Sequence, residues 1–185
     1  ITQQDVIDYY EKGKALPDKA LLLVFEDGRT DTAIFSQPIL ERENYKASMC
    51  SYGSNLSSRD SKMLKGKDLL NLEENSFWEN GTNGYRLSYI NVFDRYHTFL
   101  GEMNSLEYNA VKAYLGREYN HYLMDYLRDE NYMPIESYST MKERISYDYE
   151  LMEKTYMEQL GYVPRLYILM HSNTDMFGNN KRVSE

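Results

Sequence analysis

The first half of the chain alternates between short apolar runs and amphipathic stretches. Three apolar runs lack helical periodicity and have the length of buried strands, namely residues 20–26, 46–51 and 77–82. Three stretches with helical spacing precede or separate them, namely residues 5–12, 30–43 and 68–75. Pro38 lies inside the second of these, where we expect it to kink the helix or delay its start. Strands that alternate with helices predict parallel pairing and an α/β architecture.

The second half of the chain has longer periodic stretches. Helical spacing runs through residues 105–128 and 136–160, which predicts two long helices, with Gly161 as the C-cap of the second. Residues 165–170 are a candidate for a fourth strand. Four strands are too few to close a barrel. We therefore expect residues 1–185 to form a single α/β domain whose barrel is incomplete, with a C-terminal part missing.

Composition and charge argue against several classes of protein. The 185 residues carry a net charge of −8, which disfavours a nucleic-acid partner because phosphate binding requires clustered lysines and arginines. No apolar run approaches the roughly 18 residues of a membrane span. The single cysteine, Cys50, excludes an internal disulfide and is expected to be a small buried residue of a strand. Nineteen tyrosines are unusual, and they suit interfaces and sugar-binding faces.

Charged residues follow the first apolar run directly, in the order Glu26-Asp27-Gly28-Arg29. In parallel sheets and barrels, ligands bind at the carboxyl ends of the strands, so this is the first candidate site. Two carboxylates in different surroundings can act as acid and base, as glycosidases use them. Alternatively, one carboxylate forms a salt bridge with Arg29 or Arg86 and anchors the loop.

Polar side chains also follow the third and fourth candidate strands. Asn83, Arg86 and Tyr89 have groups that can bind sugar hydroxyls or a carboxylate. The guanidinium of Arg86 could neutralise the carboxylates at the end of the first strand. His171 and Asn173 end the fourth candidate strand at the same edge. His171 is either a cleft residue or a structural histidine.

The order of these motifs resembles the polysaccharide deacetylase (NodB-homology) family over residues 19–95. The resemblance is carried by Val24-Phe25-Glu26-Asp27-Gly28 and Phe77-Trp78-Glu79-Asn80-Gly81-Thr82-Asn83, with a helix and a strand between them. It implies a distorted (β/α) barrel. The family's first strand usually ends in Thr-Phe-Asp-Asp-Gly, whose first Asp is the general base and whose second binds a metal ion. Its third strand usually reads Glu-Ile-Gly-Ser-His, with a second His four residues later.

The chain departs from the family where the chemistry takes place. By resemblance, Glu26 stands at the base position, Asp27 retains the metal position, and Asn83 and Leu87 replace the two histidines. An amide oxygen is a weak ligand for a zinc-like ion, and Leu87 offers no ligand atom. We therefore expect no cofactor, at most a weakly held divalent ion at Asp27, and no metal-dependent deacetylation.

Two functions remain within this resemblance. One is metal-free acid/base hydrolysis of a glycan by Glu26 and Asp27, with His171 as a third catalytic candidate. The other is glycan binding without catalysis. The charge gathered at the strand ends slightly favours the hydrolase. The expected substrate-binding residues are the same in both cases: Arg29, Asn83, Arg86, Tyr89 and Asn173.

Other interpretations also stay open at this point. A domain that binds a protein partner through its tyrosine-rich helices is a third function. Leu169-Met170-His171 resembles either the family's late Leu-x-His motif or its mid-barrel strand. The resemblance also implies an extracellular or cell-envelope location.

Overall fold

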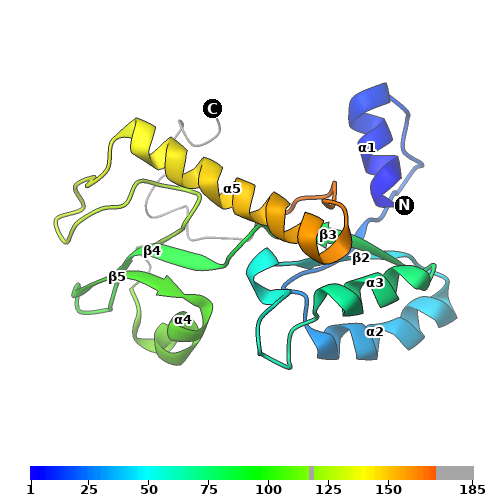
Figure 1. Ribbon diagram of the computed structural model, residues 1–185, viewed down its shortest axis with the longest axis horizontal. Coiled ribbons are helices and arrows are strands. Elements are labelled where there is room, and N and C mark those ends of the chain that lie inside the picture. The colour runs from blue at the N-terminus through cyan, green and yellow to red at the C-terminus, as the bar shows by residue number, and fades with distance from the viewer. Residues whose placement is uncertain (117–118, 170–185) are drawn as a thin grey trace. The chain divides into compact units, whose positions relative to one another are not determined.

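The computed structural model describes residues 1–116 and 119–169, which form two compact units (Figure 1). The first unit contains residues 1–86 and 151–169. The second contains the described residues between 87 and 150. The single domain expected from the sequence stays a prediction.

A three-stranded parallel sheet forms the centre of the first unit. Its strands are β1 (Leu23–Phe25), β2 (Ala47–Ser51) and β3 (Trp78–Thr82), in the order β1-β2-β3. All three strands and their parallel pairing were expected from the apolar runs. The pairing places the carboxyl ends of the strands at one edge of the sheet, where Glu26 and Asp27 follow β1 directly.

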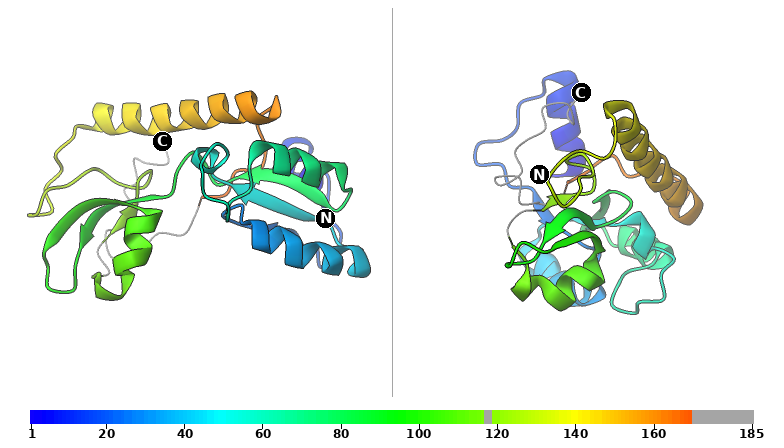
Figure 2. Two further views of the ribbon diagram at one scale, coloured as in Figure 1. Left: turned by 60° about the horizontal axis from the view of Figure 1, so that its bottom comes forward. Right: turned by 90° about the vertical axis from the view of Figure 1, so that its left-hand side faces the viewer.

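Helices cover both faces of this sheet. They are α1 (Gln3–Lys12), α2 (Thr30–Glu43) and α3 (Gly66–Glu74), with a short 3₁₀ turn, η1 (Gly53–Asn55), after β2. The crossover helices α2 and α3 lie on the same face (Figures 1 and 2), as right-handed connections require. α2 has the predicted bounds, and Pro38 lies within it without ending it.

The side chains of the strands show which face each helix covers. Asn80 of β3 donates a hydrogen bond from Nδ2 to the Leu69 carbonyl of α3 at 3.1 Å. Gln3 of α1 donates from Nε2 to Ser48 Oγ of β2 at 2.9 Å. Since Ser48 pairs with Glu79, the neighbour of Asn80, and side chains alternate along a strand, α1 lies on the face opposite α3. Apolar side chains fill the space around the sheet, and Cys50 is fully buried in β2 as predicted.

The described strands form an open sheet, so the closed barrel implied by the resemblance is not seen in this part of the chain. The fourth strand predicted over residues 165–170 pairs with β3 only through a parallel bridge between Tyr167 and Thr82. Thr82 donates its N–H to the Leu166 carbonyl at 2.8 Å and accepts from the Ile168 N–H at 2.9 Å. The Ile168 carbonyl instead accepts a hydrogen bond from the Asn83 side chain. This carbonyl therefore does not continue the backbone hydrogen bonds of a regular strand pair.

The second unit is built around an antiparallel sheet in the order β5-β4-β6. Its strands are β4 (Ser88–Phe93), β5 (Phe99–Asn104) and β6 (Asn120–His121), which the sequence had not led us to expect. α4 (Ser105–Val111) and a 3₁₀ turn, η2 (Lys112–Tyr114), follow β5. The long helix α5 (Tyr138–Leu160) contributes residues to both units.

Of the two predicted long helices, the described residues contain one, α5, which matches the prediction over residues 136–160 to within two residues. The helix predicted over residues 105–128 ends at Val111. Further along, side chains bond the adjacent backbone: His121 Nδ1 accepts from the Leu123 N–H at 3.2 Å, and Asp125 Oδ1 accepts from the Tyr126 N–H at 2.7 Å. Such local bonds offer the backbone an alternative to helical hydrogen bonds. Within the described ranges, no helix has the length and apolar character needed to cross a bilayer.

Candidate functional site

A tight turn ends β1 and carries the first predicted site residues. Asp27 and Gly28 both have left-handed backbone, with φ of 69° and 63°. A Cβ on Gly28 would lie 2.6 Å from the Cβ of Ser51, because the turn passes directly against the end of β2. Only glycine fits this position, whereas aspartate is one of the few other residues that tolerate left-handed backbone.

Asn83 connects this turn to the far side of the sheet. Its Oδ1 accepts a hydrogen bond from the Asp27 N–H at 3.2 Å, and its Nδ2 donates to the Ile168 carbonyl at 2.9 Å. Its own N–H donates to the Ser51 carbonyl at 2.9 Å, and the residue is fully buried. The structure thus brings together two of the residues that the sequence singled out, Asp27 and Asn83, although β1 and β3 are not neighbours.

The two carboxylates at the end of β1 have different surroundings. Glu26 is exposed, while Asp27 is half-buried and its Oδ1 has no hydrogen-bond partner among the described residues. Burial raises the pKa of Asp27, and the charge of Arg29 opposes that rise only in part. The pKa of Cys50 is raised to about 12, mainly by burial and to a smaller extent by the negative charge of Glu26.

The arginines near the turn have other contacts. Arg29 pairs with Asp31, with 2.6 Å between Nη2 and Oδ2, so its ion pair is not with the strand-end carboxylates. The guanidinium carbon of Arg86 lies 5.0 Å from the centre of the Tyr85 ring, in the range of a cation–π contact. Neutralisation of Glu26 or Asp27 by Arg86 stays a prediction.

The residues that hold the end of β2 were not predicted from the sequence. Tyr156 of α5 is fully buried, and its hydroxyl lies 2.8 Å from Ser51 Oγ and donates to the Ser51 carbonyl at 2.6 Å. Burial raises the pKa of Tyr156 to about 12, although its bonds to Ser51 and Thr82 act in the opposite direction. The available signal was the helical spacing of Tyr156 from Met152 and Leu160, four residues away on either side, and this spacing is easily taken for simple packing.

Three predicted site residues remain, namely Tyr89, His171 and Asn173. Tyr89 belongs to the second unit, where its ring packs against those of Tyr108 and Tyr119, with centroids 4.3 and 5.3 Å away. His171 and Asn173 lie outside the described residues, and so does the end of the Leu169-Met170-His171 motif. The predictions for these three residues therefore stay predictions.

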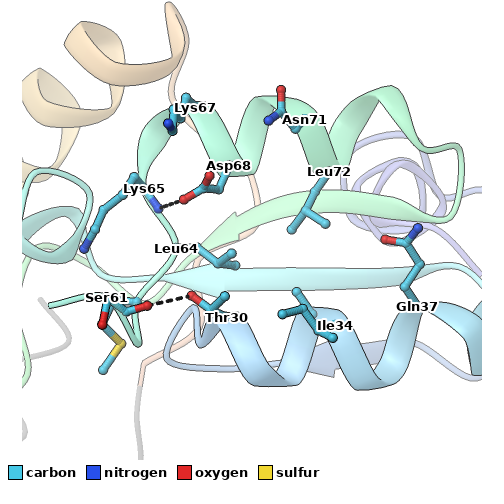
Figure 3. A pocket seen from close by; sticks show the side chains of 12 residues that line it. Thr30, Ile34, Gln37, Ser61, Leu64, Lys65, Lys67, Asp68, Asn71 and Leu72 are labelled. Atoms are coloured by element: carbon cyan, nitrogen blue, oxygen red, sulfur yellow. Dashed lines mark hydrogen bonds between the residues drawn. The ribbon is translucent and has the colours of Figure 1, made fainter.

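A groove of about 460 Å³ lies between α2 and α3 in the first unit (Figure 3). Apolar side chains from both helices and the preceding loop line it, with Gln37 and Asn71 among its polar residues. The Lys65 ammonium points away to three acceptors, Ser58 Oγ at 2.9 Å and the carbonyls of Asn55 and Asp60. The groove therefore offers mainly apolar surface.

Metal-binding side chains do not gather in the described part of the chain, where no three His, Cys, Asp or Glu residues are arranged to hold an ion. At the strand ends the donors are one half-buried carboxylate, one exposed carboxylate and an amide that is already bonded on both sides. Such groups can accept hydrogen bonds from hydroxyls or exchange a proton with them.

Known proteins resemble the chain in structure. No protein-family model and no curated protein matches the sequence. A de-N-acetylase from Aggregatibacter actinomycetemcomitans is similar with a TM-score of 0.60 and 19% identity, over 95% of this chain and 66% of that chain. The BpsB deacetylase domain from Bordetella bronchiseptica is similar with a TM-score of 0.64 and 16% identity, over the same shares. The chain spans slightly less than two thirds of either structure, and at these identities the likeness establishes the fold alone.

Proposed function

We propose that this chain is a glycan-binding domain on a deacetylase-type scaffold and that it does not carry out metal-dependent deacetylation. Its fold is similar to those of two deacetylase structures. Its candidate site lies at the carboxyl ends of parallel strands, the edge at which α/β proteins bind ligands. The glycan is an expectation drawn from that likeness in fold.

The bonding of Asn83 carries the proposal. The resemblance assigns this position to a histidine ligand, yet the amide oxygen accepts from the Asp27 N–H and the amide nitrogen donates to the Ile168 carbonyl. Asn83 therefore holds the site together, and its amide oxygen, already bonded to the Asp27 N–H, is a weak ligand for an ion. With Leu87 at the second histidine position, the donor set is too poor for a zinc-like ion.

The carboxylates supply the polar contacts of the proposed site. Glu26 is exposed and offers acceptor oxygens to sugar hydroxyls, and the Oδ1 of Asp27 is an acceptor left without a partner in the described residues. Hydrogen bonds to a charged acceptor contribute more than neutral ones, because they are shorter and stronger.

Titration calorimetry with N-acetylglucosamine oligomers and their fully deacetylated counterparts tests the proposal. We expect binding of one series in the presence of EDTA. Glu26→Gln should weaken it about tenfold, since a hydrogen bond to a charged group is worth about 1.5–3 kcal/mol and the glutamine amide keeps a neutral acceptor in its place. Glu74→Gln, an exposed change at the end of α3, is the control and should leave affinity unchanged. Lack of binding to either series, or zinc-dependent release of acetate, would contradict the proposal.

A second function, metal-free hydrolysis, is favoured by the unequal surroundings of the two carboxylates. Asp27, with its raised pKa, would donate a proton to the leaving oxygen, and exposed Glu26 would take a proton from the attacking water. Product analysis by chromatography separates the two functions. If the unsubstituted chain produces shortened oligomers and Glu26→Gln does not, hydrolysis is established. If the oligomers stay intact with both proteins, the result supports binding alone.

A further inference from the structure

The outer face of α2 is apolar although it is exposed. Ala33 and Leu40 point into the first unit and are buried. On the outside, Phe35 is 75% exposed, Ile34 62% and Ile39 51%. Soluble proteins rarely leave a contiguous set of large apolar side chains uncovered, and such sets mark interaction surfaces.

The residues of this outer face are arranged symmetrically about the middle of the helix. Phe35 and Pro38 lie equally far from the point midway between residues 36 and 37, and so do Ile34 and Ile39. At 3.6 residues per turn, Phe35 and Pro38 lie at the centre of the face and the two isoleucines flank it on opposite sides. A two-fold axis through this point therefore places apolar residues on apolar residues.

Charges at the two ends of the face follow the same symmetry. Asp31 and Arg42 are both exposed, lie on the centre line of the outer face, and are equidistant from the same midpoint. When two copies of α2 run antiparallel, Asp31 of each copy faces Arg42 of the other. A parallel arrangement would place like charges together, which is unfavourable.

We propose that this face binds a second copy of the chain, with the two α2 helices antiparallel about a two-fold axis. Self-complementarity is what such an interface requires, since residue i contacts j and j contacts i. Phe35 faces Ile39 of the second copy, and Ile34 faces its Pro38. The second copy, rather than an unrelated protein, is chosen because both the apolar and the charged positions repeat under this one symmetry operation.

The groove between α2 and α3 extends the interface. Ile34 forms part of its wall, together with Leu64 and Leu72 (Figure 3). The Pro38 side chain that the two-fold arrangement places opposite Ile34 would lie against this apolar wall. Burial of that wall would remove further apolar surface from water.

The end charges set the direction of pairing more than its strength. Asp31 already pairs with Arg29 at 2.6 Å, and Arg42 with Glu43 at 2.7 Å. Exposed pairs of this kind contribute little, so they do not prevent either residue from meeting a second partner. The apolar centre of the face supplies most of the affinity, and the charges select the antiparallel arrangement.

Sedimentation of the 185-residue chain tests the interface. At about 50 μM protein we expect two chains per particle, and one chain per particle for Phe35→Glu, because a charge at the centre of the face cannot be buried. Tyr10→Glu places the same charge at an exposed position of α1 and should leave two chains per particle. A single chain per particle without any substitution, or a pair that persists in Phe35→Glu, would overturn the proposal.

A charge exchange tests the antiparallel arrangement separately. Asp31→Arg and Arg42→Asp should each raise the dissociation constant at least tenfold, since each brings like charges together. The double variant Asp31→Arg/Arg42→Asp restores opposite charges and should return the constant to within about threefold of the unsubstituted value. Circular dichroism confirms that each variant is folded. Additive losses in the double variant would refute the pairing of these two positions.

Discussion

Two adjacent residues with left-handed backbone end β1, and they adopt this conformation for different reasons. Gly28 has no Cβ to collide with Ser51, whereas the Asp27 N–H is held by the Asn83 amide. The position of Asp27 and Asn83 at one sheet edge was predictable, because parallel strands end together. The hydrogen bond between them could not be predicted, since it depends on the register of the strands and on the residue at which each strand ends.

Replacement of Gly28 by alanine should be far more costly than the same change at another left-handed glycine. Gly28→Ala introduces both backbone strain and a contact of 2.6 Å to the Ser51 Cβ. Gly13→Ala, at φ of 66° with no atom within 4 Å of the new Cβ, introduces the strain alone. In urea unfolding, we expect Gly13→Ala to lower the free energy of unfolding by about 1–2 kcal/mol. Gly28→Ala should lower it by about 1–3 kcal/mol more, because of the added contact. Equal losses would show that the turn can move away from β2.

The raised pKa of Asp27 makes stability depend on pH. A carboxyl whose pKa is higher in the folded than in the unfolded chain binds its proton more tightly when folded. Its stabilising contribution is complete below the unfolded value, near 3.8, and is lost as pH rises through the raised folded value. Asp27→Asn, which cannot ionise, should therefore gain stability relative to the unsubstituted chain as pH rises through this window. Urea midpoints measured from pH 3 to 7 that stay parallel for the two proteins would contradict this expectation.

Most regular elements of the first unit follow from local patterns, whereas the strands of the second unit do not. The runs at 46–51 and 77–82 became β2 and β3 within a residue, because each is bounded by polar turns. The run at 20–26 shortened to three residues in β1. The β4–β5 hairpin was missed, although the β-branched and aromatic residues of β4 favour strands.

The predicted helix over 105–128 failed because its polar residues have partners outside a helix. Asp125 is fully buried and pairs with Arg128, with 2.9 Å between Oδ2 and Nε. Arg144 of α5 donates to the Asp125 carbonyl at 2.8 Å and to Glu136 Oε1 at 2.6 Å. The contact from Arg144 to the Asp125 carbonyl joins residues 19 apart in the sequence, so periodicity alone could not reveal it.

α5 supports the sheet of the first unit through one hydroxyl. Tyr156→Phe removes the bonds to both oxygens of Ser51 while keeping the buried ring. We expect a loss of about 1–3 kcal/mol in the free energy of unfolding, because the buried Ser51 hydroxyl is left with one partner fewer. Tyr147→Phe, on the same helix but 59% exposed, should change stability by less than about 0.5 kcal/mol. A similar small change for both variants would show that the Tyr156 hydroxyl contributes nothing to stability.

The sequence predicted the architecture of the molecule mainly over the residues that carry the resemblance to the deacetylase family. The resemblance covers residues 19–95, and the similar solved structures confirm a deacetylase-type fold over nearly the whole chain. The antiparallel sheet of the second unit lies mostly beyond that motif. Nothing in the local pattern separates the chain into two units, because the division depends on long-range contacts.

Chelation provides a test on the whole chain. A resident ion at one hundred times its dissociation constant would stabilise the fold by about 2.7 kcal/mol, which corresponds to several degrees in the midpoint of thermal unfolding. Since the donors at the strand ends do not suit such an ion, EDTA should leave the midpoint unchanged to within about 1 °C. A larger drop that added zinc reverses would show that the chain assembles a metal site.

The amide at position 83 also affects the conditions under which the strand ends keep their geometry. An asparagine side chain neither gains nor loses a proton between about pH 5 and 8, the interval in which histidines change charge. The bridge from Asp27 to Ile168 therefore persists in acidified, zinc-starved surroundings, where imidazole ligands would protonate and release their ion. The backbone of the Asp27 turn should therefore have the same geometry at about pH 5 as at pH 8.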